Sequence, residues 1–99
     1  GVEDGPLQLV SEIEYSNAPR FLTVQVSRNI LNEAIRNLNA YAAPRVDSPS
    51  ALLLTAEEIT AIIDQGELSR TLLLCVAHLK RIEMQMKGTR MYRIRSSPI

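Results

Sequence analysis

The sequence predicts a single α+β domain. Three observations support this fold class: apolar residues spaced three and four apart over 28–42, a capping-box tetrapeptide at 55–58, and alternation of apolar and polar residues on both sides of Gly88. The chain has 99 residues, 45% of them hydrophobic and 22% charged. That length supports one modest core, and that composition excludes disorder along the whole chain.

The N-terminal part is expected to form a β-hairpin. Apolar side chains share one parity in each of two runs, which a turn-like break at 16–20 separates; they are Leu7, Leu9, Ile13 and Tyr15, then Leu22, Val24 and Val26. A period of two is typical of half-buried strands. The chain is therefore divided into a hairpin extension (1–27), a core (28–95) and a tail (96–99).

The core is expected to open with a helix from Arg28 to Ala42. Ser27 or Asn29 can cap its start, and Pro44 stops it. Its apolar stripe consists of Ile30, Leu31, Ala34, Ile35, Leu38, Tyr41 and Ala42. A loop over 44–50 follows, because that stretch holds two prolines and several polar turn formers.

Two more helices are predicted after a short apolar run at 51–54. Thr55 and Glu58 form a capping box, and Gly66 is expected to end the helix that they open. Ser69 is expected to cap the next helix. The residues that should face the core are Ile59 and Ile62 of the first, and Leu72, Leu73, Val76 and Leu79 of the second.

The segment after Arg81 has two interpretations. Alternation in 82–86 and 89–95 around a tip at Lys87-Gly88 favours a hairpin, with Tyr92 and Ile94 facing inward. The high helix propensity of Glu and Met favours a helix that continues to Lys87 instead. The alternation makes the hairpin the preferred prediction.

The segment Leu52 to Arg95 resembles the winged helix-turn-helix family. There, a short strand leads into the pattern L-T-x-x-E-I, a turn introduces the recognition helix, and a two-stranded wing follows. The matching stretches are Leu54–Ile59, Leu68–Thr71 and Ile82–Ile94. The resemblance implies three helices and a C-terminal β-hairpin wing, to which this chain adds the N-terminal hairpin.

The resemblance also implies duplex DNA as the partner, in transcriptional regulation. In the family the recognition helix enters the major groove and the wing lies on the flanking backbone. The residues so placed at the DNA are Arg70, Thr71, His78, Arg81, Lys87, Arg90, Arg93 and Arg95.

The charge distribution agrees with an anionic partner. Residues 69–99 carry seven bases against one acid, whereas residues 1–68 carry four bases against ten acids. A concentrated positive field attracts phosphates even on a neutral protein. The alternative is that the two ends neutralise each other within the fold.

Protein contact is the contrasting hypothesis. Leu74 and Cys75 suit a DNA groove poorly, so the predicted recognition helix can equally serve a protein-assembly module or a homodimer. Its contact surface would be the face with Leu74 and Cys75, or the hairpin from Leu7 to Val26.

The sequence predicts no enzyme, no cofactor and no bound small molecule. Cys75 and His78 share a helical face, but no further Cys or His completes a metal site and no acid orients them as a nucleophile pair. Glu57 and Glu58 belong to a helix start, and no glycine-rich phosphate loop is present. Without a bilayer-spanning run or signal peptide, and with a single Cys, no membrane association and an intracellular location are expected.

Overall fold

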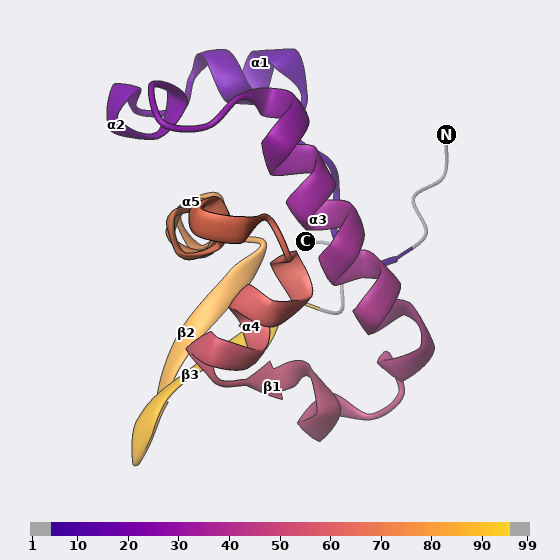
Figure 1. The fold of residues 1–99 in the computed structure, drawn as a ribbon. Coiled ribbons are helices and arrows are strands. Elements are labelled where there is room, and N and C mark those ends of the chain that lie inside the picture. Colours follow the sequence, from indigo (N-terminus) through magenta and orange to yellow (C-terminus); the bar gives the residue numbers. More distant parts are fainter. Residues whose placement is uncertain (1–4, 96–99) are drawn as a thin grey trace.

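The computed structural model describes residues 5–95, which form an α+β fold with a three-stranded antiparallel sheet (Figure 1). The predicted tail at 96–99 lies outside these residues. The helices are α1 (Glu12–Ser16), α2 (Arg20–Thr23), α3 (Arg28–Ala42), α4 (Ala56–Ile63) and α5 (Ser69–His78). The strands are β1 (Leu53–Leu54), β2 (Ile82–Lys87) and β3 (Thr89–Ile94). Short 3₁₀ turns at Ala43–Arg45, Pro49–Leu52 and Gly66–Leu68 connect them.

The predicted N-terminal hairpin is wrong. Residues 12–16 and 20–23 are helical, because the Ser11 hydroxyl accepts a hydrogen bond from the Glu14 amide and Pro19 sets the extended backbone that precedes α2. Leu22 and Val26 are buried while Val24 between them is 67% exposed. Residues four apart share a face on a helix as well as on a strand, so this short run did not distinguish the two periods.

Helix α3 is confirmed over its predicted bounds. The Ser27 hydroxyl accepts a hydrogen bond from the Ile30 amide, as an N-cap should. Leu31, Ala34, Ile35, Leu38 and Ala42 of the predicted stripe are fully buried. The helix therefore forms one side of the core.

The connection between α4 and α5 differs from the prediction at both of its ends. The capping box is confirmed, with reciprocal hydrogen bonds of 2.8 and 3.1 Å between Thr55 and Glu58. However, α4 ends at Asp64, which adopts the left-handed conformation that Gly66 was expected to supply. Ser69 is inside α5 rather than its cap, and its hydroxyl accepts a hydrogen bond from the Gln65 amide across the turn.

The C-terminal hairpin is confirmed, and the continuous helix is excluded. Lys80 adopts a left-handed conformation with φ 68°, and the Arg81 amide donates to the Val76 carbonyl, so α5 terminates before β2 begins. In the sheet, β3 lies between β1 and β2; Tyr92 pairs with Leu54 on one side and Met84 on the other. The hairpin turns at Gly88, whose φ of 80° favours glycine.

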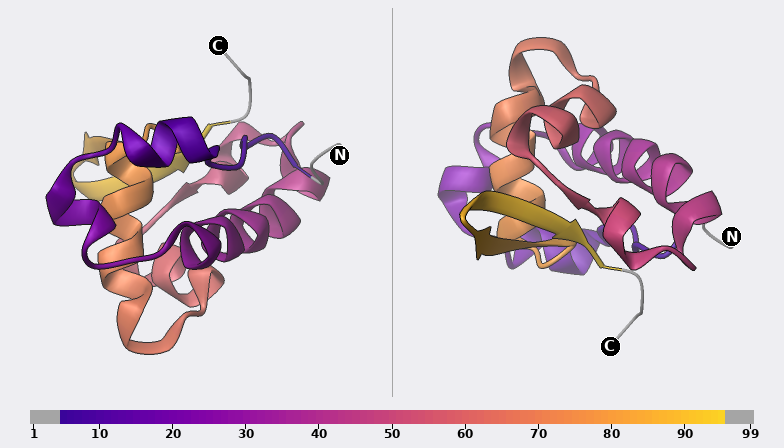
Figure 2. Two further views of the ribbon diagram at one scale, coloured as in Figure 1. Left: turned by 90° about the horizontal axis from the view of Figure 1, so that it is seen from above. Right: turned by 90° about the horizontal axis from the view of Figure 1, so that it is seen from below.

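The core lies between the three longer helices and one face of the sheet. Leu73 and Val76 of α5 are buried as predicted, against α3 and α4, whereas Leu79 at the end of α5 is only partly buried. Tyr92 and Ile94 complete the core from β3. Seen from above, α1 crosses over one end of α5, and α2 lies beside that helix (Figure 2).

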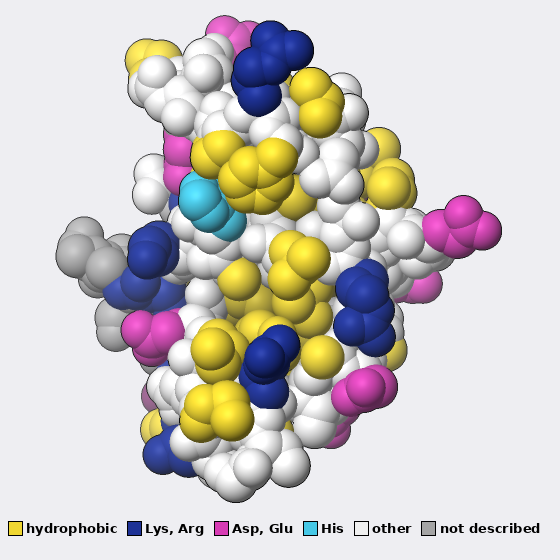
Figure 3. Space-filling model, turned by 90° about the vertical axis from the view of Figure 1, so that its left-hand side faces the viewer, with side chains coloured by type: hydrophobic (Ala, Val, Ile, Leu, Met, Phe, Trp, Pro, Cys, Tyr) yellow, Lys and Arg dark blue, Asp and Glu magenta, His cyan; other side chains and the backbone are white. Residues whose placement is uncertain are grey.

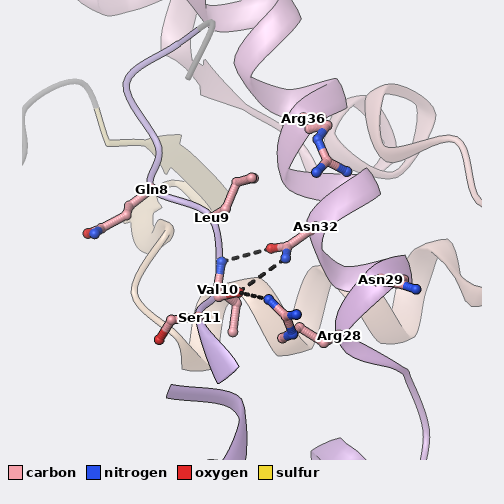
Figure 4. Close-up of a pocket in the computed structure, with 8 residues that line it drawn as sticks. All are labelled: Gln8, Leu9, Val10, Ser11, Arg28, Asn29, Asn32 and Arg36. Atoms are coloured by element: carbon pink, nitrogen blue, oxygen red, sulfur yellow. Dashed lines mark hydrogen bonds between the residues drawn. The ribbon is translucent and has the colours of Figure 1, made fainter. Parts of the chain in front are cut away.

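Two asparagines of α3 hold the N-terminal segment in place. The Asn39 side chain accepts a hydrogen bond from the Leu7 amide and donates one to the Leu7 carbonyl, both 2.8 Å long. Asn32 makes the same pair of bonds to Val10, at 2.7 and 3.1 Å (Figure 4). Each amide therefore satisfies both backbone groups of one buried residue, as a neighbouring strand would.

We call these two pairs of hydrogen bonds, Asn39 to Leu7 and Asn32 to Val10, the asparagine clamps. The distance between the two asparagines along α3 matches the distance between Leu7 and Val10 along the extended segment. Seven residues of helix rise about 10.5 Å, and three residues of extended chain span about 10 Å. At the Asn39 end, a Cβ on Gly5 would lie 2.5 Å from the Asn39 Cβ, so only glycine permits this approach. Buried Leu7 and Val10 add apolar contact with the core.

Leu73→Ala should lower the free energy of unfolding by about 2–5 kcal/mol, because it leaves a cavity beside α3 and α4. Leu74→Ala, one residue along and 61% exposed, is the matched control and should change it by less than about 0.5 kcal/mol. Urea unfolding monitored by circular dichroism measures both. Equal effects would contradict the orientation of α5.

Asn39→Ala should cost about 1–3 kcal/mol, because the buried backbone groups of Leu7 lose their partners. Amide exchange at Leu7 should accelerate more than exchange in α4. Asn29→Ala, on the exposed side of the same helix, is the control and should leave both quantities near the parent values. An unchanged Leu7 exchange rate in Asn39→Ala would refute the clamp.

Candidate interaction surface

The outer side of α5 presents a mixed stripe of three exposed residues. Arg70, Leu74 and His78 are four residues apart, so they share one face. Leu74, at the centre, is 61% exposed. The opposite side is buried through Leu72, Leu73, Cys75 and Val76. Helix α5 therefore buries apolar side chains on its inner side and exposes one large apolar side chain, Leu74, on its outer side.

Helix α2 borders this stripe at its C-terminal end. The Phe21 ring packs edge-on against the His78 ring, with centroids 5.5 Å apart and planes at 88°. Phe21 nevertheless remains 54% exposed, and Val24, one turn further on, is 67% exposed. The covered end of α5 thus continues into a second set of exposed apolar side chains.

The C-terminal hairpin borders the stripe on its other side. Ile82, Met84 and Met86 alternate along β2 and share the sheet face that packs on α5. Ile82 is 1% exposed, whereas Met84 is 49% and Met86 65% exposed, because the hairpin extends past the edge of the core. Arg90 pairs with Met86 in the register, so its side chain belongs to this face too.

These residues together form what we call the docking face: Phe21, Val24, Leu74, His78, Met84 and Met86. Figure 3 views the molecule from this side. Hydrophobic side chains extend from beside the one His of the chain, in cyan, down to the hairpin, with Lys and Arg side chains among and beside them. Acidic side chains lie toward the margins of this view.

The structure separates the eight residues predicted to contact DNA. Arg70 and Arg90 are exposed at the docking face, His78 is exposed against Phe21, and Lys87 is exposed at the hairpin tip. Thr71 is only partly exposed. The remaining three, Arg81, Arg93 and Arg95, are placed elsewhere.

Arg81 is engaged within the fold. Its guanidinium makes two hydrogen bonds to the Glu14 carboxylate, at 2.6 and 2.8 Å, and donates to the carbonyls of Gln8 and Leu9 at 2.8 and 3.2 Å. The side chain is 11% exposed. Arg81 therefore fastens α1 and the segment before it to the end of α5, and it is not free to contact a phosphate.

Arg93 and Arg95 lie on the opposite face of the sheet from Arg90. Arg93 is paired in the register with Glu83 on β2 and Leu53 on β1, and its guanidinium donates to the Pro49 carbonyl at 2.9 Å. Arg95 shares the parity of Arg93 and is partly buried. A single DNA surface cannot use these two arginines together with Arg90.

The pair Cys75 and His78 is divided by burial. Cys75 is 2% exposed, and burial raises the pKa of its thiol, so the unreactive protonated form is favoured. His78 lies on the outer side of the helix. Within residues 5–95, no group of three or more His, Cys, Asp or Glu side chains could hold a metal ion.

A polar cavity of about 500 Å³ lies between α3 and the N-terminal segment, lined among others by Arg28, Asn32 and Arg36 (Figure 4). Arg28 donates to the Val10 carbonyl and lies 3.7 Å from the Glu12 carboxylate; Arg36 pairs with Glu33 at 3.3 Å. Both guanidinium groups thus have partners in the fold. The cavity accordingly carries no argument for a ligand.

Sequence reasoning missed Phe21, Val24, Met84 and Met86 as surface residues. Val24 was assigned to a strand that does not form, and Phe21 was given no place in any predicted element. Met84 and Met86 lie on the same face of β2 as the buried Ile82. They are exposed because this part of the hairpin extends beyond the core. Leu74 was recognised from its place on α5.

Comparison with known proteins adds no relative: no family model, no curated protein and no solved structure matches this chain. Within residues 5–95, no helix has the length and apolar character needed to cross a bilayer.

Glu14→Gln should lower the free energy of unfolding by about 1–3 kcal/mol, because the largely buried Arg81 loses a charged partner. Glu12→Gln is the matched control: its carboxylate is 85% exposed and 3.7 Å from Arg28, so its loss should cost less than about 0.5 kcal/mol. Thermal melts at neutral pH compare the two. If Glu12→Gln proved the more damaging, the fastening role of Arg81 would be wrong.

Proposed function

We propose that the chain is a winged-helix module that binds another protein through the docking face. The element order α3, β1, α4, α5, β2, β3 and the sheet order β1-β3-β2 support the winged-helix assignment. The chain adds two short helices, α1 and α2, to that arrangement. Their position beside α5 favours a protein over duplex DNA as the partner.

The observation that carries this proposal is the exposure of Leu74 among other large apolar side chains. Leu74, in the middle of α5, is 61% exposed. On the neighbouring strand, Met84 is 49% exposed and Met86 is 65% exposed. Contiguous apolar surface exposed by a folded domain marks an interaction site. Protein–DNA interfaces, in contrast, are more polar and more positively charged than protein–protein interfaces.

The position of α2 is a second support. A recognition helix enters the major groove because it protrudes from the domain. Here the ribbon of α5 is set back between α2 and the hairpin tip (Figure 1). Phe21 also covers the His78 end of α5, so α2 would meet the DNA backbone before α5 reached the base edges.

Duplex DNA remains a second candidate because of three exposed cations. Arg70 stands in the first turn of α5, while Lys87 and Arg90 flank the hairpin tip. Long cationic side chains at such positions can contact phosphates and, from α5, guanine edges. Arg70 and Arg90 lie on the same side of the molecule as the docking face, so the two proposals make opposed predictions for the apolar residues.

Leu74→Asp should weaken protein binding, because a carboxylate at the centre of an apolar contact would be buried without a partner. The screen uses the parent chain and a display library of fragments from the proteome of its own organism. For each purified fragment that binds, Leu74→Asp should lower the affinity on the order of tenfold or more, as expected for a central contact residue. Fluorescence anisotropy measures the affinities.

Ile13→Asp is the matched control, since Ile13 is 76% exposed on α1 and outside the docking face. It should bind fragments like the parent. In parallel, binding to random and selected duplex DNA is titrated over a salt series. Selective, strongly salt-dependent duplex binding by the parent that Leu74→Asp leaves intact would replace the protein proposal with the DNA one.

A further inference from the structure

The outer edge of β2 is a free edge of the sheet. Strand β3 lies between β1 and β2, so β2 has a strand partner on one side only. In the continued register of the hairpin, Arg95 lies opposite Arg81, and its amide donates to the Arg81 carbonyl at 3.3 Å. These two residues therefore form a hydrogen-bonded pair. Because such pairs alternate along an antiparallel ladder, Ile82, Met84 and Met86 turn their backbone N–H and C=O groups away from β3.

This edge lacks the features that usually keep an edge strand from pairing. Natural proteins protect sheet edges with bulges, prolines or a covering segment, because open backbone groups otherwise recruit another strand. The register of β2 runs through all six residues without a bulge, and the strand contains no proline. Within residues 5–95, no backbone hydrogen bond from outside the sheet reaches β2. The edge is therefore available to a further strand.

The two charged side chains of β2 have opposite signs. Glu83 and Lys87 lie on the sheet face that also carries Gln85, whereas Met84 and Met86 lie on the other face. Both charged side chains are exposed, and within residues 5–95 neither takes part in an ion pair. A second copy of β2 running antiparallel presents the same residues in the opposite order. The strand can therefore be complementary to itself.

One two-fold register makes it so. When Gln85 lies opposite its own counterpart, Glu83 of each copy lies opposite Lys87 of the other. In this register Met84 lies opposite Met86, and both have free backbone groups, so each such pair can exchange two hydrogen bonds. Centring the register on Glu83 would instead oppose two carboxylates, and centring it on Met84 or Met86 would set one charge against Gln85. Opposite charges directly across a strand pair stabilise it, and like charges destabilise it.

From this self-complementarity we infer that two copies of the chain pair through β2 and join their sheets into one continuous antiparallel sheet. The two-fold axis passes beside Gln85. The outer part of the hairpin is accessible to a second copy, because it projects from the helices and leaves Met84 and Met86 49% and 65% exposed (Figure 1). The inference does not depend on the proposed function, since the contact is made by the backbone edge of β2 and by charges on the face away from α5.

Sedimentation equilibrium of the whole chain tests the association. Between about 10 µM and about 1 mM the parent should show a reversible monomer–dimer equilibrium, because an edge contact is smaller than a standard interface. Glu83→Lys and Lys87→Glu each set like charges opposite each other, so each should weaken the dimer at least about tenfold, a difference of about 1.4 kcal/mol. Glu67→Lys, which makes the same charge change at an exposed position outside the sheet, is the control and should associate like the parent.

An equimolar mixture of the two charge variants provides the decisive comparison. In the mixed pair, the introduced lysine lies opposite the introduced glutamate, and the original Lys87 lies opposite the original Glu83. The mixture should therefore associate about as strongly as the parent, although neither variant associates well alone. Two variants that had merely lost their fold could not restore each other.

Gln85→Cys tests the position of the two-fold axis. Opposite residues of a non-hydrogen-bonded pair have Cα atoms about 4.5 Å apart, which a disulfide can bridge. Mild oxidation of Gln85→Cys should therefore give a covalent dimer. Thr89→Cys, on β3, is the control and should not cross-link, because three strand spacings of about 4.8 Å would separate the two β3 strands. The native Cys75 is 2% exposed and does not compete.

The remaining outcomes overturn the inference. A parent chain that stays monomeric at the highest concentration would refute it, as would a mixture of the charge variants that fails to associate. Dimerisation that both charge variants retain would place the interface elsewhere. An extended peptide that binds a monomeric parent, and that Met84→Pro rejects, would reassign the edge to a strand of another protein. None of these results bears on Leu74-dependent fragment binding, so the proposed function stands or fails separately.

Discussion

The position of residues 5–26 depends on the hydrogen bonds that Asn32 and Asn39 make to the backbone of Val10 and Leu7. A segment without helix or strand partners would otherwise bury its amides and carbonyls unsatisfied, at a cost of about 1–3 kcal/mol for each group. Each asparagine offers one donor and one acceptor at the spacing of a peptide unit. The N-terminal segment can thus lie against a helix and still satisfy its backbone.

Arg81 completes this attachment from the other side of the fold. Its position directly after α5 brings a guanidinium to Glu14 and to the carbonyls of Gln8 and Leu9. The asparagines and the arginine place α1 and α2 over α5, which in turn places Phe21 against His78. The composition of the docking face is therefore a consequence of polar contacts in a segment outside the helix-and-hairpin core.

The fold alone does not decide which ligand this surface binds. A helix followed by a basic hairpin is compatible with DNA binding, yet the same frame serves any ligand that its exposed side chains suit. The C-terminal third carries seven bases, but not all of them are free to contact a ligand on one face. Arg81 is hydrogen-bonded to Glu14, and Arg93 donates to the Pro49 carbonyl on the other face of the sheet. Thus a charge count along the sequence overstates the positive charge available on one face.

The sequence determined the helices and strands whose ends are marked by residues close by in the chain. Helix α3 with its Ser27 cap, the Thr55–Glu58 capping box and the alternation on both sides of Gly88 all involve residues a few positions apart, so their physical causes are visible in the chain. The α+β class followed from them. Leu73 and Val76 were identified as core residues for the same reason.

Only the tertiary structure decided the N-terminal segment and the surface that it borders. In that segment period two and period four assign several of the same residues to one face, and the choice fell to contacts with Asn32, Asn39 and Arg81, which lie 22 to 73 positions away along the chain. Exposure of Met84 and Met86 depended on where the core ends beneath β2, a property of packing rather than of parity. Hydrogen bonds and packing between distant residues have no local signature, which is why the sequence indicated Leu74 and His78 of this surface but not Phe21, Val24, Met84 and Met86.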